Sequence, residues 1–270
     1  MLAALSCGRR DIYEVFVMEG WSDKNKKDAH LLRKVQLLAE GRGVTVTEMN
    51  KHDMNLLSEH RPHQGLALDV GPLELVQLKG PPSTLRSMLL PSESSEPPES
   101  FDVQIAGRPP LWLILDQVTD PQNLGALLRT AYFLGLDGVG VCAKNSAPLS
   151  ATVSKASAGA LEVMTLHEIG NLPKYLTACV EKGWTVLGAE AGDDATEVRE
   201  MTVRQPTVVV MGSEGFGLRP LVRHACSGLV RIDGGMLGVR HGEFEVDSLN
   251  VSVAAGIMLH HLSGSREIVR

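Results

Sequence analysis

The chain has 270 residues, of which 43% are hydrophobic and 21% charged, as in an ordinary globular protein. This length is enough for two domains or one large one. The formal net charge of −6 at pH 7 excludes a strongly basic whole-molecule surface, although a local patch, or one assembled across a dimer, would still neutralise phosphates.

No apolar run reaches the length of a membrane span, so we expect no membrane association. The four cysteines are far apart and form no Cys-x-x-Cys pair, which favours a reducing compartment and argues against a zinc site. We therefore expect no metal. Residues 1–10 are too short for a signal peptide and do not make a complete transit peptide.

Residues 1–75 alternate between strand and helix patterns, which predicts a small α/β unit. The expected elements are strands at 12–18, 44–46 and 65–70 and helices at 28–41 and 51–59. The tripeptide His63-Gln64-Gly65 opens the last of these strands. From the residues alone, His63 is either a turn residue or an RNA contact.

Residues 76–110 interrupt this alternation with a segment rich in proline, serine and glutamate, including 92–100. Such a composition cannot bury a core, and it predicts a flexible linker between two domains.

From Leu111 the alternation resumes, and the continuous apolar run 111–115 is typical of a parallel strand covered on both faces. The order of elements predicts a parallel, doubly wound sheet. Further strands are expected at 138–142, 184–189, 207–211 and 229–232, and helices at 122–134, at 172–182 and after Ser248, which we assign as an N-cap.

Three runs in this second part carry the candidate chemistry. The first is Leu115 to Ala131, with Asp-Pro-Gln-Asn at 120–123 and Arg129 six residues after Asn123. Arginine on a helix is ordinarily solvated, but the apolar neighbours of Arg129 favour a ligand. The second, 212–217, is Gly-Ser-Glu-Gly-Phe-Gly after a buried strand, where α/β sheets bind ligands. Its Glu214 would repel a phosphate, which argues against a phosphate-binding loop and is compatible with a phosphate-free cofactor. The third is Ser-Leu-Asn-Val-Ser at 248–252.

Taken in order, these runs resemble the three motifs of the SpoU branch of the SPOUT RNA methyltransferases, which methylate the ribose 2′-hydroxyl of rRNA or tRNA with S-adenosylmethionine. The mitochondrial large-subunit rRNA enzymes are the most similar group. The resemblance implies an L30e-like RNA substrate-binding domain at 1–75 and a SpoU catalytic domain with a trefoil knot at 111–270. It also implies a homodimer, rRNA as the partner and a mitochondrial location. Members of this family usually carry more sequence before the position that corresponds to residue 1.

By this resemblance, Arg129, Glu214, Ser248 and Asn250 are catalytic, and Gly212, Ile232 and Leu249 hold the cofactor. RNA contacts are expected from Asn123, Arg129, His63 and Gln64. The target would be a guanosine of mitochondrial large-subunit rRNA. One departure is the Asp-Gly-Gly after Ile232, with a longer stretch to Asp247 than is usual in the family. The alternatives are a tRNA 2′-O-methyltransferase and a noncatalytic RNA-binding assembly factor.

Overall fold

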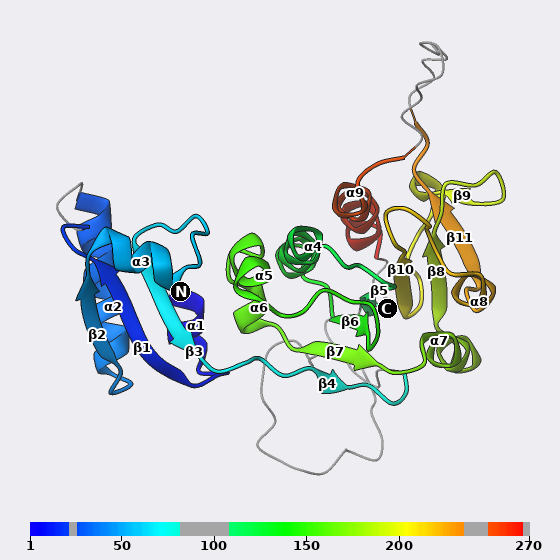
Figure 1. The fold of residues 1–270 in the computed structure, drawn as a ribbon. Helices are drawn as coiled ribbons and strands as arrows, with labels where there is room; N and C mark the ends of the chain where they lie inside the picture. The colour runs from blue at the N-terminus through cyan, green and yellow to red at the C-terminus, as the bar shows by residue number, and fades with distance from the viewer. Residues whose placement is uncertain (22–25, 82–107, 235–247, 267–270) are drawn as a thin grey trace, which may run out of the picture. The chain divides into compact units, whose positions relative to one another are not determined.

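The structure, a computed structural model, describes residues 1–21, 26–81, 108–234 and 248–266. The chain divides into two compact units, Met1–Glu74 and Leu75–Arg270 (Figure 1). Each unit has its own sheet and is described by itself.

The first unit is a three-stranded sheet with β1 (Ile12–Met18) in its centre. Strand β2 (Thr45–Met49) runs parallel to β1, and β3 (Leu66–Val70) runs antiparallel to it. Side chains alternate along β1, so that Val15 and Val17 enter the core. The helices are α1 (Leu2–Cys7), α2 (Lys26–Glu40) and α3 (Lys51–Leu57), of which α1 is not anticipated by the sequence pattern. The likeness to L30e stays a prediction.

The second unit contains an eight-stranded sheet in the order β4-β7-β6-β5-β10-β8-β11-β9, and every pairing in it is parallel. This confirms the predicted parallel sheet. Its strands are β4 (Val76–Gln77), β5 (Leu111–Leu115), β6 (Gly138–Cys142), β7 (Leu166–Ile169), β8 (Thr185–Ala189), β9 (Thr196–Glu197), β10 (Thr207–Met211) and β11 (Gly228–Arg231). The edge strand β4 comes from residues expected in the linker, of which 82–107 lie outside the described residues.

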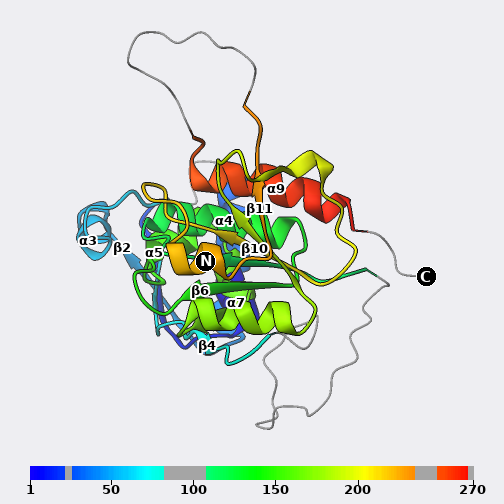
Figure 2. The same cartoon turned by 90° about the vertical axis from the view of Figure 1, so that its right-hand side faces the viewer.

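Helices cover both faces of this sheet (Figure 2). On one face, α7 (Leu172–Glu181) and α8 (Pro220–His224) share a core with alternate strand residues such as Trp112 and Ile114. On the other face lie α4 (Pro121–Phe133) and α9 (Val251–Gly264), which pack against each other. The short elements α5 (Ala151–Ala156), α6 (Ala160–Val163) and η2 (Val198–Glu200) complete the unit.

Because β5 and β10 are buried on both faces, all of their residues are apolar or nearly so, and all are buried. Their neighbouring carboxyl ends place the segments that follow them, from Asp116 and from Gly212, at one edge of the sheet. The trefoil knot stays a prediction, and residues 235–247 lie outside the described residues. Within the described ranges, no helix is long and apolar enough to cross a membrane.

Candidate active site

The first run becomes a capped helix start. The Asp120 side chain accepts a hydrogen bond from the backbone N–H of Gln122 at 3.1 Å, and Pro121 occupies the first helical position. These two residues therefore have a structural explanation. The cap leaves Asn123 in the first turn of α4, buried at 7% exposure, with its amide directed towards the second run.

The second run is a tight loop after β10. Ser213 and Gly217 exchange two backbone hydrogen bonds of 3.0 and 2.9 Å, and Gly217 has a φ of 63°. A Cβ atom at Gly212 would lie 2.4 Å from the carbonyl of Gly217, so only glycine fits where the loop closes on itself. The loop thus holds Glu214 next to the carboxyl end of the sheet.

The third run starts α9, and here the sequence interpretation is wrong. We expected Ser248 as the N-cap, but the cap is Asn250, whose Oδ1 accepts from the backbone N–H groups of Ser252 and Val253 at 2.9 and 3.4 Å. The Ser252 hydroxyl donates to the same oxygen at 2.6 Å. Capping fixes the orientation of the Asn250 amide, so its Nδ2 group points away from the helix.

The three runs meet through these side chains. Nδ2 of Asn250 donates to Glu214 Oε1 at 2.7 Å and to Asn123 Oδ1 at 3.1 Å. Nδ2 of Asn123 donates to the same Glu214 oxygen at 2.5 Å. The cluster thus joins residues that are 91 and 127 positions apart in the sequence. Two amides fix one carboxylate oxygen. Among the described residues, none donates a hydrogen bond to the other oxygen, Oε2, which is therefore available to a ligand.

An ion pair between a buried carboxylate and a partly exposed arginine ties the Glu214 loop to the sheet, and we did not predict it from the sequence. Asp116 directly follows β5 and is fully buried, and it pairs with Arg219 at 2.7 Å. Arg219 follows the second run and is the N-cap residue of α8, so the pair ties the end of the Glu214 loop to β5. The sulfur of Cys142 contacts both partners, and burial, together with the Asp116 charge, raises the pKa of this thiol to about 11. The sequence does contain a signal for this pair, because Asp116 is a single aspartate directly after an apolar strand.

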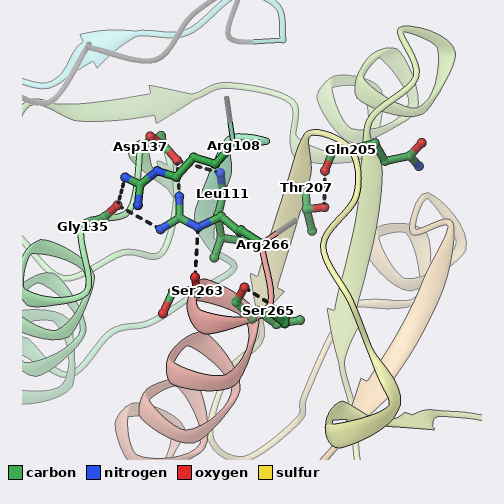
Figure 3. Close-up of polar contacts among 10 residues, drawn as sticks. Arg108, Leu111, Gly135, Asp137, Gln205, Thr207, Ser263, Ser265 and Arg266 are labelled. Carbon is green, nitrogen blue, oxygen red and sulfur yellow. Dashed lines mark hydrogen bonds and ion pairs between the residues drawn. The ribbon is translucent and has the colours of Figure 1, made fainter. Parts of the chain in front are cut away.

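The far ends of α4 and α9 are also joined (Figure 3). Arg266 follows α9, and its guanidinium pairs with Asp137 at 3.0 Å while both side chains are buried. Arg266 also donates to the carbonyl of Gly135, just after α4, and Asp137 accepts from the backbone N–H of Leu111 at 2.8 Å. The helices that carry Asn123 and Asn250 are therefore held side by side at both ends.

The remaining predicted residues are placed as follows. Arg129 is exposed on α4, and no hydrogen bond or ion pair joins it to the described part of the chain. Gly212 is buried, Ile232 is half-buried just after β11, and Leu249 is 49% exposed. Because all strands are parallel, Gly212 and Ile232 lie at the same edge of the sheet. Ser248 is exposed two residues before the cap.

In the first unit, His63 is held by its own surroundings. Its Nδ1 accepts from the backbone N–H of Gly65 at 3.1 Å, so its Nε2 carries the proton and donates to Asn55 Oδ1 at 2.9 Å. Both ring nitrogens are engaged, which leaves only the ring face for an RNA contact. Gln64 is exposed beside it. A Cβ atom at Gly65 would lie 2.2 Å from the indole ring of Trp21, which occupies that space.

A hollow of about 230 Å³ opens next to the cluster. It is lined from the first run by Gln117, Val118, Thr119, Asp120 and Asn123, and from the other two by Ser213, Glu214, Gly215 and Val251. Gln117 has a φ of 61°, a left-handed conformation that costs about 1–2 kcal/mol for a residue with a Cβ. Such strain is common at ligand sites. The exposed carboxylate suits a cationic or hydroxyl-bearing ligand better than a phosphate.

Comparison with known families gives two matches. The SpoU rRNA Methylase family matches residues 110–260, and the RNA 2′-O ribose methyltransferase substrate binding family matches residues 1–76.

Individual relatives agree with these matches. A Dictyostelium discoideum protein named "rRNA methyltransferase 1, mitochondrial" is 32% identical over 82% of this chain, which spans only 42% of that relative. The Homo sapiens protein of the same name is 34% identical over 98% of this chain and 71% of its own length. A Pseudomonas syringae pv. tomato 23S rRNA (guanosine-2′-O-)-methyltransferase is 36% identical over 93% of this chain and 88% of its own length.

Among solved structures, an AdoMet-bound rRNA methyltransferase from Sinorhizobium meliloti has a TM-score of 0.67 at 20% identity, covering 96% of this chain and 83% of that one. At this identity the likeness concerns the fold. It agrees with the α/β architecture described above.

Proposed function

Since the chain belongs to the SpoU rRNA methylase family, we propose that it transfers a methyl group from S-adenosylmethionine to a ribose 2′-hydroxyl of rRNA. One observation carries this proposal. The side chains of Asn123, Glu214 and Asn250, one from each of the three runs, form a single hydrogen-bonded cluster beside a hollow. A merely structural role for these runs does not require an exposed carboxylate held by two amides.

The residues at this sheet edge fit the cofactor. S-adenosylmethionine carries a positive sulfonium and no phosphate, and Glu214 is a carboxylate on a loop whose backbone closes without a phosphate cradle. Gly212, Ile232 and Leu249 would hold it at the carboxyl edge of the sheet. The cofactor supplies an electrophilic methyl group when it is bound. The chain's own residues must then position the hydroxyl and accept its proton.

Glu214 is the residue that we assign to proton acceptance. Its Oε1 is fixed by two amide donors, which directs Oε2 towards the open side. A positioned general base of this kind typically contributes about 10²- to 10⁴-fold to a rate. In this arrangement every polar atom of the Asn250 amide bonds within the protein, so Asn250 acts through Glu214 and is a positioning residue.

We assign to Arg129 the role of binding the phosphate backbone of the RNA. It lies six residues after Asn123, about 9 Å further along the helix, and its side chain makes no hydrogen bond or ion pair with the described residues. Arginine stays protonated in proteins and is a poor base, but its planar fork binds a phosphate through two hydrogen bonds. Arg129 would therefore hold the phosphate next to the target ribose.

We propose that the chain forms a homodimer through the exposed apolar face of α9. The apolar residues Val251 and Leu259 of this helix are buried inside the unit. The exposed residues are instead Leu249, Val253 and Ile257, at 49%, 50% and 43%. Val253 and Ile257 are spaced four apart and so lie on one side of α9, and Leu249 directly precedes its N-cap residue Asn250. Val253→Glu should convert a dimer to a monomer in light scattering.

A guanosine of mitochondrial large-subunit rRNA is the target that we propose. The support is the names of the relatives, one mitochondrial and one specific for guanosine of 23S rRNA. Mapping the methylated nucleotide in a large-subunit rRNA transcript tests this choice, with a tRNA transcript as the comparison.

The central experiment compares the wild type with Glu214→Gln. Glutamine preserves the oxygen that accepts from Asn123 and Asn250, but it replaces Oε2 with an amide that cannot accept a proton. We expect both proteins to bind S-adenosylmethionine in calorimetry and the variant to lose at least about 100-fold in methyl transfer. A folded wild type without cofactor binding would refute the proposed function, and an active variant would refute the role of Glu214.

A further inference from the structure

Phe216 is an aromatic side chain exposed to solvent at the tip of the Glu214 loop. It is 95% exposed, more than any other large hydrophobic residue of the described ranges, and the next is Phe133 at 85%. An exposed aromatic ring contributes nothing to the core. Its position next to Glu214 makes it available to a ligand of the candidate site.

The loop holds this ring in a fixed place. Ser213 and Gly217 close it with two reciprocal backbone hydrogen bonds. Immediately after the loop, the Leu218 side chain is buried in the core and Arg219 pairs with the buried Asp116. The backbone beneath the ring is thus anchored on both sides, so binding a ligand there requires little ordering.

The ring also lies close to the reacting group. Phe216 follows Glu214 by two residues, which places their Cα atoms within about 7 Å of each other. A nucleotide whose ribose reaches Glu214 has its base, or that of its neighbour, within reach of the ring. No other aromatic side chain lies within the three runs among the described residues.

We propose that Phe216 is a stacking platform for a nucleobase of single-stranded RNA at or next to the methylated ribose. This inference rests on the proposed function. Sequence-specific RNA recognition uses unstacked bases placed on aromatic side chains, and such stacking does not depend on charge. It suits a chain of net charge −6, which has little general attraction for phosphates.

The test measures binding and methylation of an unmethylated large-subunit rRNA transcript at several salt concentrations. We expect Phe216→Ala to weaken RNA binding about 5- to 150-fold, the effect of losing one stacked base. Phe216→Trp should retain affinity, whereas Phe216→Leu, which is apolar but not aromatic, should not restore it. Binding of S-adenosylmethionine should stay as in the wild type.

Salt dependence separates stacking from charge. Phe216 neutralises no phosphate, so Phe216→Ala should lower affinity by the same factor at every salt concentration. Arg129→Ala should instead reduce the slope of log affinity against log salt by about 1. Val180→Ala is the control, because it removes an exposed apolar side chain on α7, on the face of the sheet opposite to α4 and α9, and should leave RNA affinity unchanged.

Three results would overturn the inference. They are unchanged RNA affinity in Phe216→Ala, full rescue by leucine, or a changed molecular mass in light scattering, which would assign the ring to a contact between copies. If the wild type transfers no methyl group and does not bind the transcript, the proposed function fails as well. Methylation by the wild type with an unaffected Phe216→Ala variant refutes the stacking role alone.

Discussion

Asn250 has two roles that substitution can separate. Its Oδ1 caps α9, and its Nδ2 holds Glu214 and Asn123. Asn250→Ser keeps a capping oxygen but has no amide donor. Asn250→Asp also keeps the cap, and it places a carboxylate where the donor to Glu214 was. Asn250→Ala removes both the cap and the donor.

The expected magnitudes differ between stability and turnover. Loss of the cap in the alanine variant should cost about 1 kcal/mol of the free energy of unfolding, whereas serine should cost much less. In Asn250→Asp, the new charge at 2.7 Å from Glu214 Oε1 is unfavourable by about 1.5 kcal/mol at the dielectric of water. Its interaction with the helix N-terminus offsets about 0.3–1 kcal/mol of this. The net cost of about 0.5–1.2 kcal/mol should leave the aspartate variant folded and about as stable as the alanine variant.

Turnover should fall in all three variants because Glu214 loses its alignment. A misplacement of about 1 Å can cost on the order of 100-fold, and Asn250→Asp should lose the most because it repels Glu214 outright. Urea unfolding followed by circular dichroism measures stability, and transfer of a labelled methyl group to rRNA measures turnover. Near-normal turnover of the aspartate variant would refute the positioning role. Equal stability of the alanine and serine variants would refute the capping role.

Three further predictions concern stability. Gly125→Ala should destabilise the second unit by about 1–3 kcal/mol in urea unfolding, because its Cβ would lie 2.4 Å from the Cβ of Ala156. Burial lowers the pKa of His167 from 6.5 to about 4, so the unfolded chain takes up the proton first and stability falls as the pH drops from 6.5 to 4. This loss should be about 2 kcal/mol at pH 5, and His167→Leu should lack it when unfolding is compared at pH 7.5 and 5. Arg266→Met should cost about 3–5 kcal/mol by leaving the Asp137 carboxylate buried without its partner. Because protonation relieves that buried charge, the deficit should shrink at low pH, and a constant deficit would contradict this explanation.

The local pattern of the sequence was sufficient to predict most elements of the fold. The expected strands 111–115, 138–142 and 207–211 have the observed bounds, because strands covered on both faces must be apolar throughout. The expected strand 12–18 also has the observed bounds, and there alternate residues enter the core. The alternation of such runs with helices predicts a parallel sheet. The two-residue strand β4 was missed, since a pair of exposed residues carries no periodicity.

The sequence also identified the chemistry before the geometry was known. The three runs stand out through residues that a buried strand or a helix face does not require, such as Glu214 after β10 and Arg129 among apolar neighbours. Their position after parallel strands predicts that they share an edge of the sheet. The family matches over residues 1–76 and 110–260 confirm the recognition that these runs permitted.

Only the tertiary structure decided which atoms meet. Ser248 and Asn250 are both good capping residues, and in the structure the cap is Asn250, whose amide also bonds Asn123 and Glu214, both distant in the sequence. The pair of Asp137 and Arg266 is likewise separated by 129 positions. The periodicity of hydrophobic residues along the sequence indicates whether a residue is buried or exposed. A hydrogen bond depends on angles and on distances of a few tenths of an ångström, which are set only when the sheet orders its strands and the helices pack onto it.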